Sequence, residues 1–173
     1  MNLNDFNSLV DLFFYQTEKQ NPASIFLEWL NPKNKKKLTW GETSSNIYKL
    51  AKILKENIVY GDRRLLVSEN RPEWLISDIA IMLANGITVP AYTTYTEKDY
   101  KYLIEDCQPS VIIVSNDEMH NKLKNIIKEK DFIKKVITFE KIRGADYNNK
   151  YLDFNFIIKN NLQTNDKIGR ASW

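Results

Sequence analysis

Glu69 and Glu73 are the carboxylates of this chain whose spacing most directly offers acid–base chemistry. Two neighbouring carboxyl groups can share the roles of proton donor and proton acceptor. The same segment is also typical of a helix start, because Asn70 can cap a helix and Pro72 fits its first turn. A glutamate at position 73 can then reach back to the cap. Capping explains Glu73 fully, so we predict a capping role for Glu73 and a solvated side chain for Glu69.

His120 and Cys107 are each the only residue of their type in the 173-residue sequence. One imidazole and one thiol cannot complete a zinc centre of ordinary ligand type. A Ser-His-Asp triad through His120 would need a serine on a strained turn, and no Gly-x-Ser-x-Gly motif provides one. We predict that His120 is exposed at a polar helix start. Cys107 lies on the apolar stripe of its helix and is predicted to be a buried, unreactive thiol.

Phosphate chemistry has no local motif in this sequence. Dinucleotide folds and kinase-like loops bring backbone N–H groups to a phosphate through clustered glycines. The chain has 5 glycines, and they do not cluster. The corners that follow Ser68 and Tyr92 are therefore predicted to be poor phosphate cradles.

Short apolar strands alternate with amphipathic helices along the chain. Strands are predicted at 24–30, 37–40, 65–67, 87–91, 111–114 and 136–139, the first two as a hairpin around a turn at 31–34. Helices are predicted near the N-terminus, through 47–54, over 74–84 and 100–107, and from 116 onward. Thr39 and Thr96 begin capping boxes, since each has an acidic residue three positions later. The alternation predicts the α/β class, a mostly parallel sheet flanked by helices with an N-terminal hairpin.

Three further features have structural interpretations. Pro90 confines its strand to an edge or an end of the sheet. Trp74 is predicted to be a core aromatic that anchors its helix rather than a ligand platform. The lysines at 35–37 are predicted to form a solvated hairpin tip rather than a contact for phosphate or acidic lipid.

Composition indicates a globular chain of about one domain, with 43% hydrophobic and 12% aromatic residues. The 25 Lys and Arg against 22 Asp and Glu leave a formal charge of +3, too small to indicate a nucleic-acid partner. One cysteine excludes an internal disulfide and favours a reducing compartment, so we expect a cytoplasmic protein. No apolar run approaches the roughly 20 residues that cross a bilayer. The amphipathic N-terminal helix leaves peripheral membrane association open.

Four segments of the sequence, taken together, match a known family. They are LTWGE (38–42), GDRRLLVSENRPEW (61–74), ANGITVPAYTTYT (84–96) and DCQPSVIIVS (106–115). Through them, residues 25–139 resemble the N-terminal subdomain of the AMP-binding, adenylate-forming superfamily. SENRPEW together with VPAYTTYT resembles the long-chain fatty acid CoA ligase branch more than the acetate or amino-acid branches.

The resemblance implies a two-step reaction that uses ATP, Mg²⁺ and CoA. A fatty carboxylate attacks the α-phosphate of ATP to give an acyl adenylate and pyrophosphate, and the CoA thiol then displaces AMP. Tyr92, Thr93 and Thr94 occupy the position of a loop near the CoA nucleotide in related ligases, where an aromatic ring can stack on adenine. They fit a strand-end turn equally well. The family's phosphate-binding loop and its later motifs are absent, so no catalytic residue or metal ligand is assigned.

We therefore expect an N-terminal fragment that is inactive alone and lacks its downstream subdomains. Residues 1–167 would be a partial N-terminal subdomain, and residues 168–173, which depart from the family pattern, a non-native or disordered tail. Two alternatives remain. One is a non-catalytic module that binds CoA, an acyl chain or a partner subunit, and the other is a weak polyanion-binding domain that uses its lysines.

Overall fold

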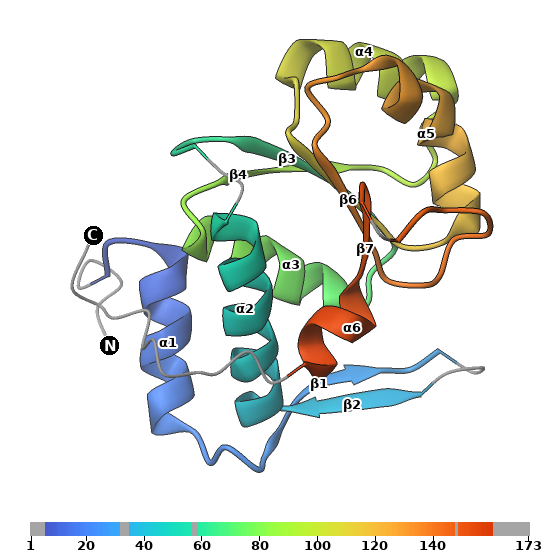
Figure 1. Cartoon of the computed structure of the whole chain (residues 1–173). Coiled ribbons are helices and arrows are strands. Elements are labelled where there is room, and N and C mark those ends of the chain that lie inside the picture. Colours follow the sequence, from blue (N-terminus) through green and yellow to red (C-terminus); the bar gives the residue numbers. More distant parts are fainter. Residues whose placement is uncertain (1–5, 32–34, 57–58, 148, 161–173) are drawn as a thin grey trace.

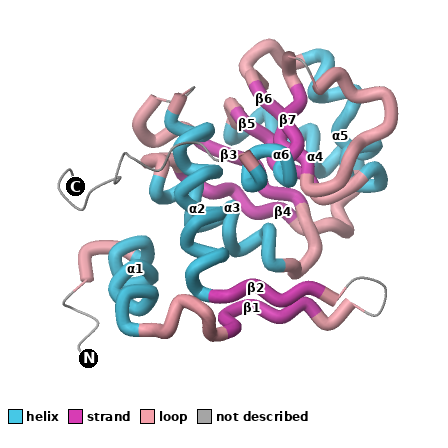
Figure 2. The backbone as a smooth tube through the Cα atoms, turned by 60° about the horizontal axis from the view of Figure 1, so that its bottom comes forward, coloured by secondary structure: helices cyan, strands magenta, loops and turns pink. Residues whose placement is uncertain are grey.

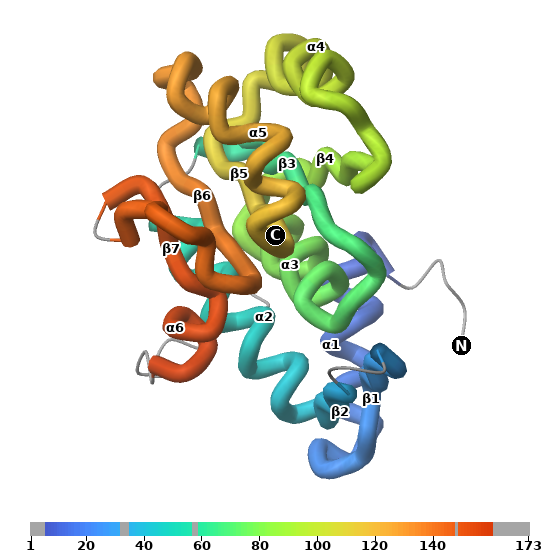
Figure 3. Tube along the Cα trace, turned by 90° about the vertical axis from the view of Figure 1, so that its right-hand side faces the viewer, coloured from blue at the N-terminus to red at the C-terminus, as the bar shows by residue number. Residues whose placement is uncertain are grey.

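A parallel sheet of five strands forms the centre of the computed structural model, which describes residues 6–31, 35–56, 59–147 and 149–160. In spatial order the strands are β4 (Ile87–Ala91), β3 (Arg63–Val67), β5 (Val111–Val114), β6 (Lys135–Thr138) and β7 (Tyr151–Asp153). All neighbouring pairs in this sheet are parallel. Figure 3 shows the strands following one another across the molecule from β4 to β7. The predicted α/β class is confirmed, and so is the edge position of the strand that contains Pro90.

Helices cover both faces of this sheet, as Figure 1 shows. One side carries α1 (Leu9–Lys19), α2 (Trp40–Lys55), α3 (Pro72–Leu83) and α6 (Phe154–Lys159), and the other carries α4 (Glu97–Cys107) and α5 (Asp117–Glu129). In β3, Leu66 packs toward α2 and α3, whereas Leu65 and Val67 pack toward α4 and α5. Because both faces are covered, the central strand β5 is an uninterrupted apolar run, Val-Ile-Ile-Val, rather than an alternating one.

An antiparallel hairpin of β1 (Ile25–Trp29) and β2 (Lys36–Thr39) lies near α1 and α2 (Figure 2). The expected turn at 31–34 falls largely on residues 32–34, which lie outside the described residues. Phe26 of the hairpin stacks on Trp40, the first residue of α2, with ring centroids 3.8 Å apart. Phe13 of α1 stacks on the same Trp40 ring at 6.1 Å. These aromatic contacts join the hairpin to the helical layer.

Helix ends follow the predicted turn chemistry, with one exception. Thr39 and Thr96 both form complete capping boxes, and Asn85 adopts a left-handed φ of 63° just beyond α3. The exception is the start of α3, where Arg71 rather than Asn70 is the N-cap and no side-chain capping bond forms. The predicted cap at Asn70 and the capping role of Glu73 are therefore wrong.

β7 and α6 have no counterpart among the predicted elements. They contain three and six residues, too few for a strand or helix periodicity to be recognised. Phe154 and Ile157 of α6 are buried in the core, and the Phe154 ring meets Phe139 edge-on at 5.2 Å. Contacts with the rest of the molecule, rather than local pattern, hold this segment in place.

The apolar residues singled out in the sequence lie in the core. Val10 and Phe13 of α1 are buried, which confirms a packing helix, and Trp74 packs partly buried against the same cluster. Cys107 is buried, and burial raises the pKa of its thiol, as expected for an unreactive cysteine. Over the described part of the chain, no helix combines the length and apolar character required to cross a membrane.

Candidate functional site at the carboxyl edge of the sheet

The chain leaves the carboxyl ends of β3 and β5 toward opposite faces of the sheet. After β3 it enters α3 on one side, and after the adjacent β5 it enters α5 on the other. In open parallel sheets, the crevice at such a switch point is where ligands bind. The residues that follow the two strands, Ser68 and Glu69 on one side and Ser115 and Asn116 on the other, therefore form the candidate site.

A side-chain hydrogen bond joins the segments that follow β3 and β5 at this switch point. The Asn116 amide donates to Glu69 Oε1 at 2.9 Å, while Asn116 Oδ1 accepts from the Met119 N–H at 3.1 Å and caps α5. The Glu69 side chain is exposed, as predicted, although it is also hydrogen-bonded. Ser115, which precedes Asn116, is fully buried, and its Oγ has no hydrogen-bond partner among the described residues. The edge thus presents a carboxylate and an amide that are hydrogen-bonded to each other.

Glu73 does not join Glu69 in a carboxylate pair. It is buried, and its two oxygens accept hydrogen bonds from Lys36 Nζ at 2.6 Å and Arg71 Nε at 3.0 Å. Burial alone would raise the pKa of Glu73, but the hydrogen bonds from Arg71 and Lys36 outweigh it and hold the pKa below its ordinary value. Glu73 therefore stays ionised, and the acid–base interpretation of the pair is wrong. Lys36, predicted to be a solvated tip residue, is an ion-pair partner instead.

Arg71 connects three parts of the fold at this edge. Besides Glu73, its guanidinium donates to Glu140 Oε1 at 2.9 Å, and it lies over the rings of Trp29 and Phe139 at 4.7 and 5.5 Å. Burial would lower the pKa of Arg71, but its bonds to the two glutamates raise it. The hairpin, α3 and the end of β6 are thereby held together. The cluster of Arg71, Glu73 and Glu140 therefore has a structural role at the carboxyl edge of the sheet. It offers no proton for transfer, because Arg71 stays protonated and Glu73 stays ionised.

Tyr92, Thr93 and Thr94 follow β4 at the same edge of the sheet. The backbone of this loop is held from both helices of its face: Tyr100 Oη donates to the Tyr92 carbonyl, and Lys122 Nζ donates to the Thr93 carbonyl, each at 2.7 Å. The Tyr92 ring is 72% exposed and meets Tyr95 edge-on at 5.5 Å. A fixed backbone with an outward aromatic ring is a surface on which a nucleotide base can stack. The role of this loop in CoA binding stays a prediction.

Glu69 acts electrostatically on Tyr100, the α4 residue that holds this loop. Burial, together with the neighbouring Tyr95 and Glu69, raises the pKa of Tyr100 to about 12. Tyr100 is therefore a neutral donor that keeps the Tyr92 carbonyl in place. The loop and the switch point thus belong to one continuous edge.

Several contacts of this edge are not predicted by the sequence. The helix start at Asn116 is predicted, but its bond to Glu69 is not, and neither are the contacts of Lys122 and Arg71. Each pairs with a residue from a distant segment, so no local spacing could have indicated the contact. Within the described ranges, no group of three or more His, Cys, Asp or Glu residues is placed to hold a metal ion.

Comparison with known proteins shows that the chain matches one protein family. The family model described as "AMP-binding enzyme" matches residues 14–160. Among curated proteins, the mitochondrial acyl-coenzyme A synthetase ACSM3 of Homo sapiens is 27% identical over 135 residues, which are 70% of this chain and 23% of that protein. A long-chain-fatty-acid–CoA ligase of Bacillus subtilis is 38% identical over 79 residues, 45% of this chain and 14% of the relative. This chain thus spans under a quarter of either relative.

Solved structures show the same fold. The anthranilate CoA ligase AuaEII, in complex with anthranoyl-AMP, superposes with a TM-score of 0.75 at 21% identity over 91% of this chain and 29% of that one. A luciferase-like enzyme from the mealworm Zophobas morio gives 0.74 at 18% identity, covering 91% and 35%.

Proposed function

Because this chain belongs to the AMP-binding enzyme family, whose model matches residues 14–160, we propose that it is the N-terminal part of an acid–thiol ligase. In the proposed reaction a carboxylate oxygen attacks the α-phosphate of ATP, and pyrophosphate leaves. The CoA sulfur then attacks the acyl carbonyl, and AMP leaves as the thioester forms. The family match carries this proposal, and the acyl-CoA synthetases among the relatives support it.

We further propose that the acid is a long-chain fatty acid. Two observations support this choice over shorter or aromatic acids. The segments SENRPEW and VPAYTTYT resemble the long-chain branch, and several relatives carry long-chain-fatty-acid–CoA ligase in their names.

The residues of this chain fit the CoA part of the reaction better than the ATP part. The exposed Tyr92 ring and the anchored carbonyls of the loop suit a nucleotide base. ATP and Mg²⁺ find no matching set: the glycines are scattered, and the described residues include no cluster of metal ligands. No chemical step is assigned to this chain, and we propose that the 173 residues alone form no thioester.

A binding experiment tests the loop assignment. Isothermal titration of the 173-residue chain with CoA should show weak binding, which Tyr92→Ala removes because the stacking surface is lost. Tyr102→Ala is the matched control, since Tyr102 is a similarly exposed tyrosine on α4, 75% exposed. Absence of CoA binding to the unmodified chain, or equal loss in both variants, would refute the assignment.

An activity experiment tests the rest of the proposal. The purified chain, incubated with ATP, CoA, Mg²⁺ and palmitate, should form no acyl adenylate and no thioester. Product from this chain, with contaminating synthetases excluded, would show that it carries its own phosphate site. Joined to the downstream part of its gene, the chain should become active on long-chain acids; activity restricted to short or aromatic acids would overturn the substrate class.

We also propose a cytoplasmic location, which the single buried thiol favours. Cell fractionation checks it. Recovery of the protein in an organelle or membrane fraction would be the contrary result.

A further inference from the structure

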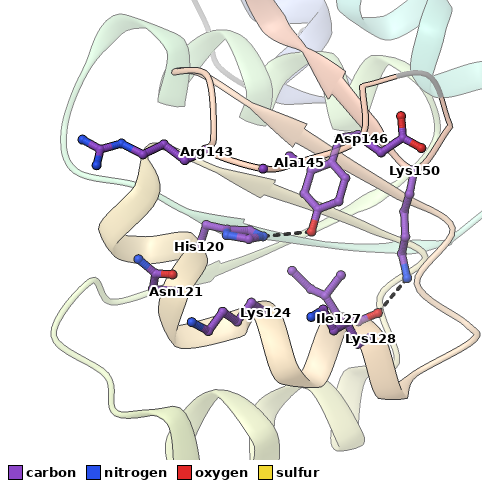
Figure 4. A pocket seen from close by; sticks show the side chains of 11 residues that line it. His120, Asn121, Lys124, Ile127, Lys128, Arg143, Ala145, Asp146 and Lys150 are labelled. Carbon is purple, nitrogen blue, oxygen red and sulfur yellow. Dashed lines mark hydrogen bonds between the residues drawn. The ribbon is translucent and has the colours of Figure 1, made fainter.

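A basic pocket separates α5 from the segment that connects β6 to β7, with a volume of about 500 Å³ (Figure 4). The cations that line it are Lys124, Lys128, Arg143 and Lys150, and the one lining carboxylate among the described residues is Asp146. One of these cations, Arg143, is ion-paired with Asp117 at 3.5 Å, so the positive charge of the pocket comes chiefly from its three lysines. A volume of roughly 300 to 1,000 Å³ is typical of small-molecule sites.

Two of these lysines are not used by the fold. Lys124 and Lys128 are exposed, and neither forms a hydrogen bond or ion pair with a described residue. They stand one turn apart on α5, a spacing at which like charges destabilise a helix. Lys36 and Lys130, by contrast, both reach a carboxylate. A stabilising contact with an anion would offset the repulsion between Lys124 and Lys128.

Two hydrogen bonds hold other residues of the pocket in place. Lys150 Nζ donates to the Ile127 carbonyl at 2.7 Å, which ties the connecting segment to α5. His120 was predicted to be exposed, but it is 8% exposed, because this segment covers it, and its Nε2 lies 2.8 Å from Tyr151 Oη. Burial, together with Lys124 and Lys128, lowers the pKa of His120, although Asp117 opposes this. The imidazole is therefore neutral at pH 7.

We propose that this pocket binds a phosphate monoester, with its dianion held between Lys124 and Lys128 and its organic part directed toward His120 and Tyr151. The site is distinct from the Tyr92 loop, because Lys122, which holds that loop, projects from α5 away from Lys124 and Lys128. It stands independently of the proposed ligase reaction. The monoester can be a soluble metabolite or the headgroup of a lipid.

The single histidine of the chain makes the site directly observable. The groups that surround His120 in the pocket are Lys124, Lys128 and Asp117 on α5, and Arg143, Asp146, Lys150 and Tyr151 on the opposite wall. A bound dianion favours the imidazolium form, so glycerol 3-phosphate should raise the His120 titration midpoint by about 0.5 or more. The measurement is the C2–H proton resonance against pH, with sodium chloride at matched ionic strength as the reference.

Paired charge variants decide whether the pocket is responsible. Lys124→Gln with Lys128→Gln should weaken glycerol 3-phosphate binding by about tenfold or more, because two charge-assisted hydrogen bonds are lost. Lys98→Gln with Lys101→Gln removes the same charge from exposed positions on α4 and should leave the affinity unchanged. If His120 of the unmodified chain responds neither to glycerol 3-phosphate nor to phosphatidic acid vesicles, or if both double variants weaken binding equally, the proposal is overturned.

A vesicle arm separates the two sources of the monoester. Phosphatidylcholine vesicles with and without phosphatidic acid are added to the same protein. A response to glycerol 3-phosphate supports a soluble ligand, whereas a response to phosphatidic acid vesicles alone, lost in the Lys124 and Lys128 variant, supports a lipid headgroup. Vesicle binding that survives this variant would contradict the site.

Discussion

Arg64 lies inside the protein with no exposed surface, and none of its guanidinium nitrogens has a hydrogen-bond partner among the described residues. It stands on the same side of β3 as Leu66, facing α2 and α3. Its neighbour in the β4 register, Thr88, also has a buried hydroxyl without a partner. An unpaired charge in such a place weakens the folded state.

The cost follows from the ionisation of this side chain. Burial lowers the pKa of Arg64 to about 10, although Asp62 acts in the opposite direction. Each tenfold change in an ionisation equilibrium corresponds to about 1.4 kcal/mol. The fall from the ordinary arginine pKa therefore means that burial of the charged guanidinium lowers the unfolding free energy by roughly 3 kcal/mol at pH 7. Arg64→Met removes the charge and leaves a small void that costs about 1 kcal/mol. The net gain in unfolding free energy is about 2 kcal/mol, or a Tm higher by about 4–8 °C.

Urea unfolding at pH 7, followed by circular dichroism, measures this gain. Arg63→Met is the matched control, because Arg63 is exposed at the start of the same strand, and its effect should stay within about 0.5 kcal/mol. A variant at position 64 that is less stable than the original protein would refute the reasoning. The guanidinium would then have a partner in solution.

Gly86 allows a second test of the same placement. A Cβ at Gly86 would lie 2.5 Å from Arg64 Nη1 and 2.8 Å from its Cζ. Gly86→Ala should therefore destabilise the original protein by about 1–3 kcal/mol, and by clearly less in an Arg64→Val background. The coupling between the two sites should reach about 1 kcal/mol in a double-mutant cycle. Strict additivity would mean that the guanidinium lies elsewhere.

Three other substitutions have defined outcomes. Glu73→Gln removes the carboxylate that pairs with both Lys36 and buried Arg71, leaves Arg71 with Glu140 alone, and should cost about 3 kcal/mol in urea unfolding. The pKa of Glu73 is lowered in the folded state, so Glu73 contributes to the unfolding free energy above the ordinary glutamate pKa, and this contribution is lost as pH falls through the folded-state pKa. The stability of Glu73→Gln should therefore depend less on acid pH, and an unchanged dependence would contradict the ionised state of Glu73. Thr39→Ala should lower stability by about 1 kcal/mol, since it removes the capping box with Glu42; no loss would show that the cap is dispensable. Asn85→Ala should cost about 1 kcal/mol because φ is 63°, whereas Asn85→Gly should be nearly neutral, and equal effects would exclude backbone strain as the cause.

Much of this fold is determined by short stretches of sequence. The β-branched run at 111–114 becomes a central strand, and the capping boxes that begin at Thr39 and Thr96 start helices where predicted. Pro90 marks an edge strand because it cannot donate a ladder hydrogen bond. These outcomes depend on interactions within a few residues, so local pattern is sufficient to predict them.

The candidate site depends on tertiary contacts. Glu73 has capping spacing in the sequence, yet Lys36 and Arg71 hold it as a buried ion, since two cations stabilise a carboxylate more than one backbone N–H does. His120 is covered by a segment that follows it by more than twenty residues. Arg63 and Arg64 are adjacent and chemically identical, but the pleat directs one to solvent and the other to the core. Which side of a sheet faces the interior is decided by what packs on it, and no local pattern of charge contains that information.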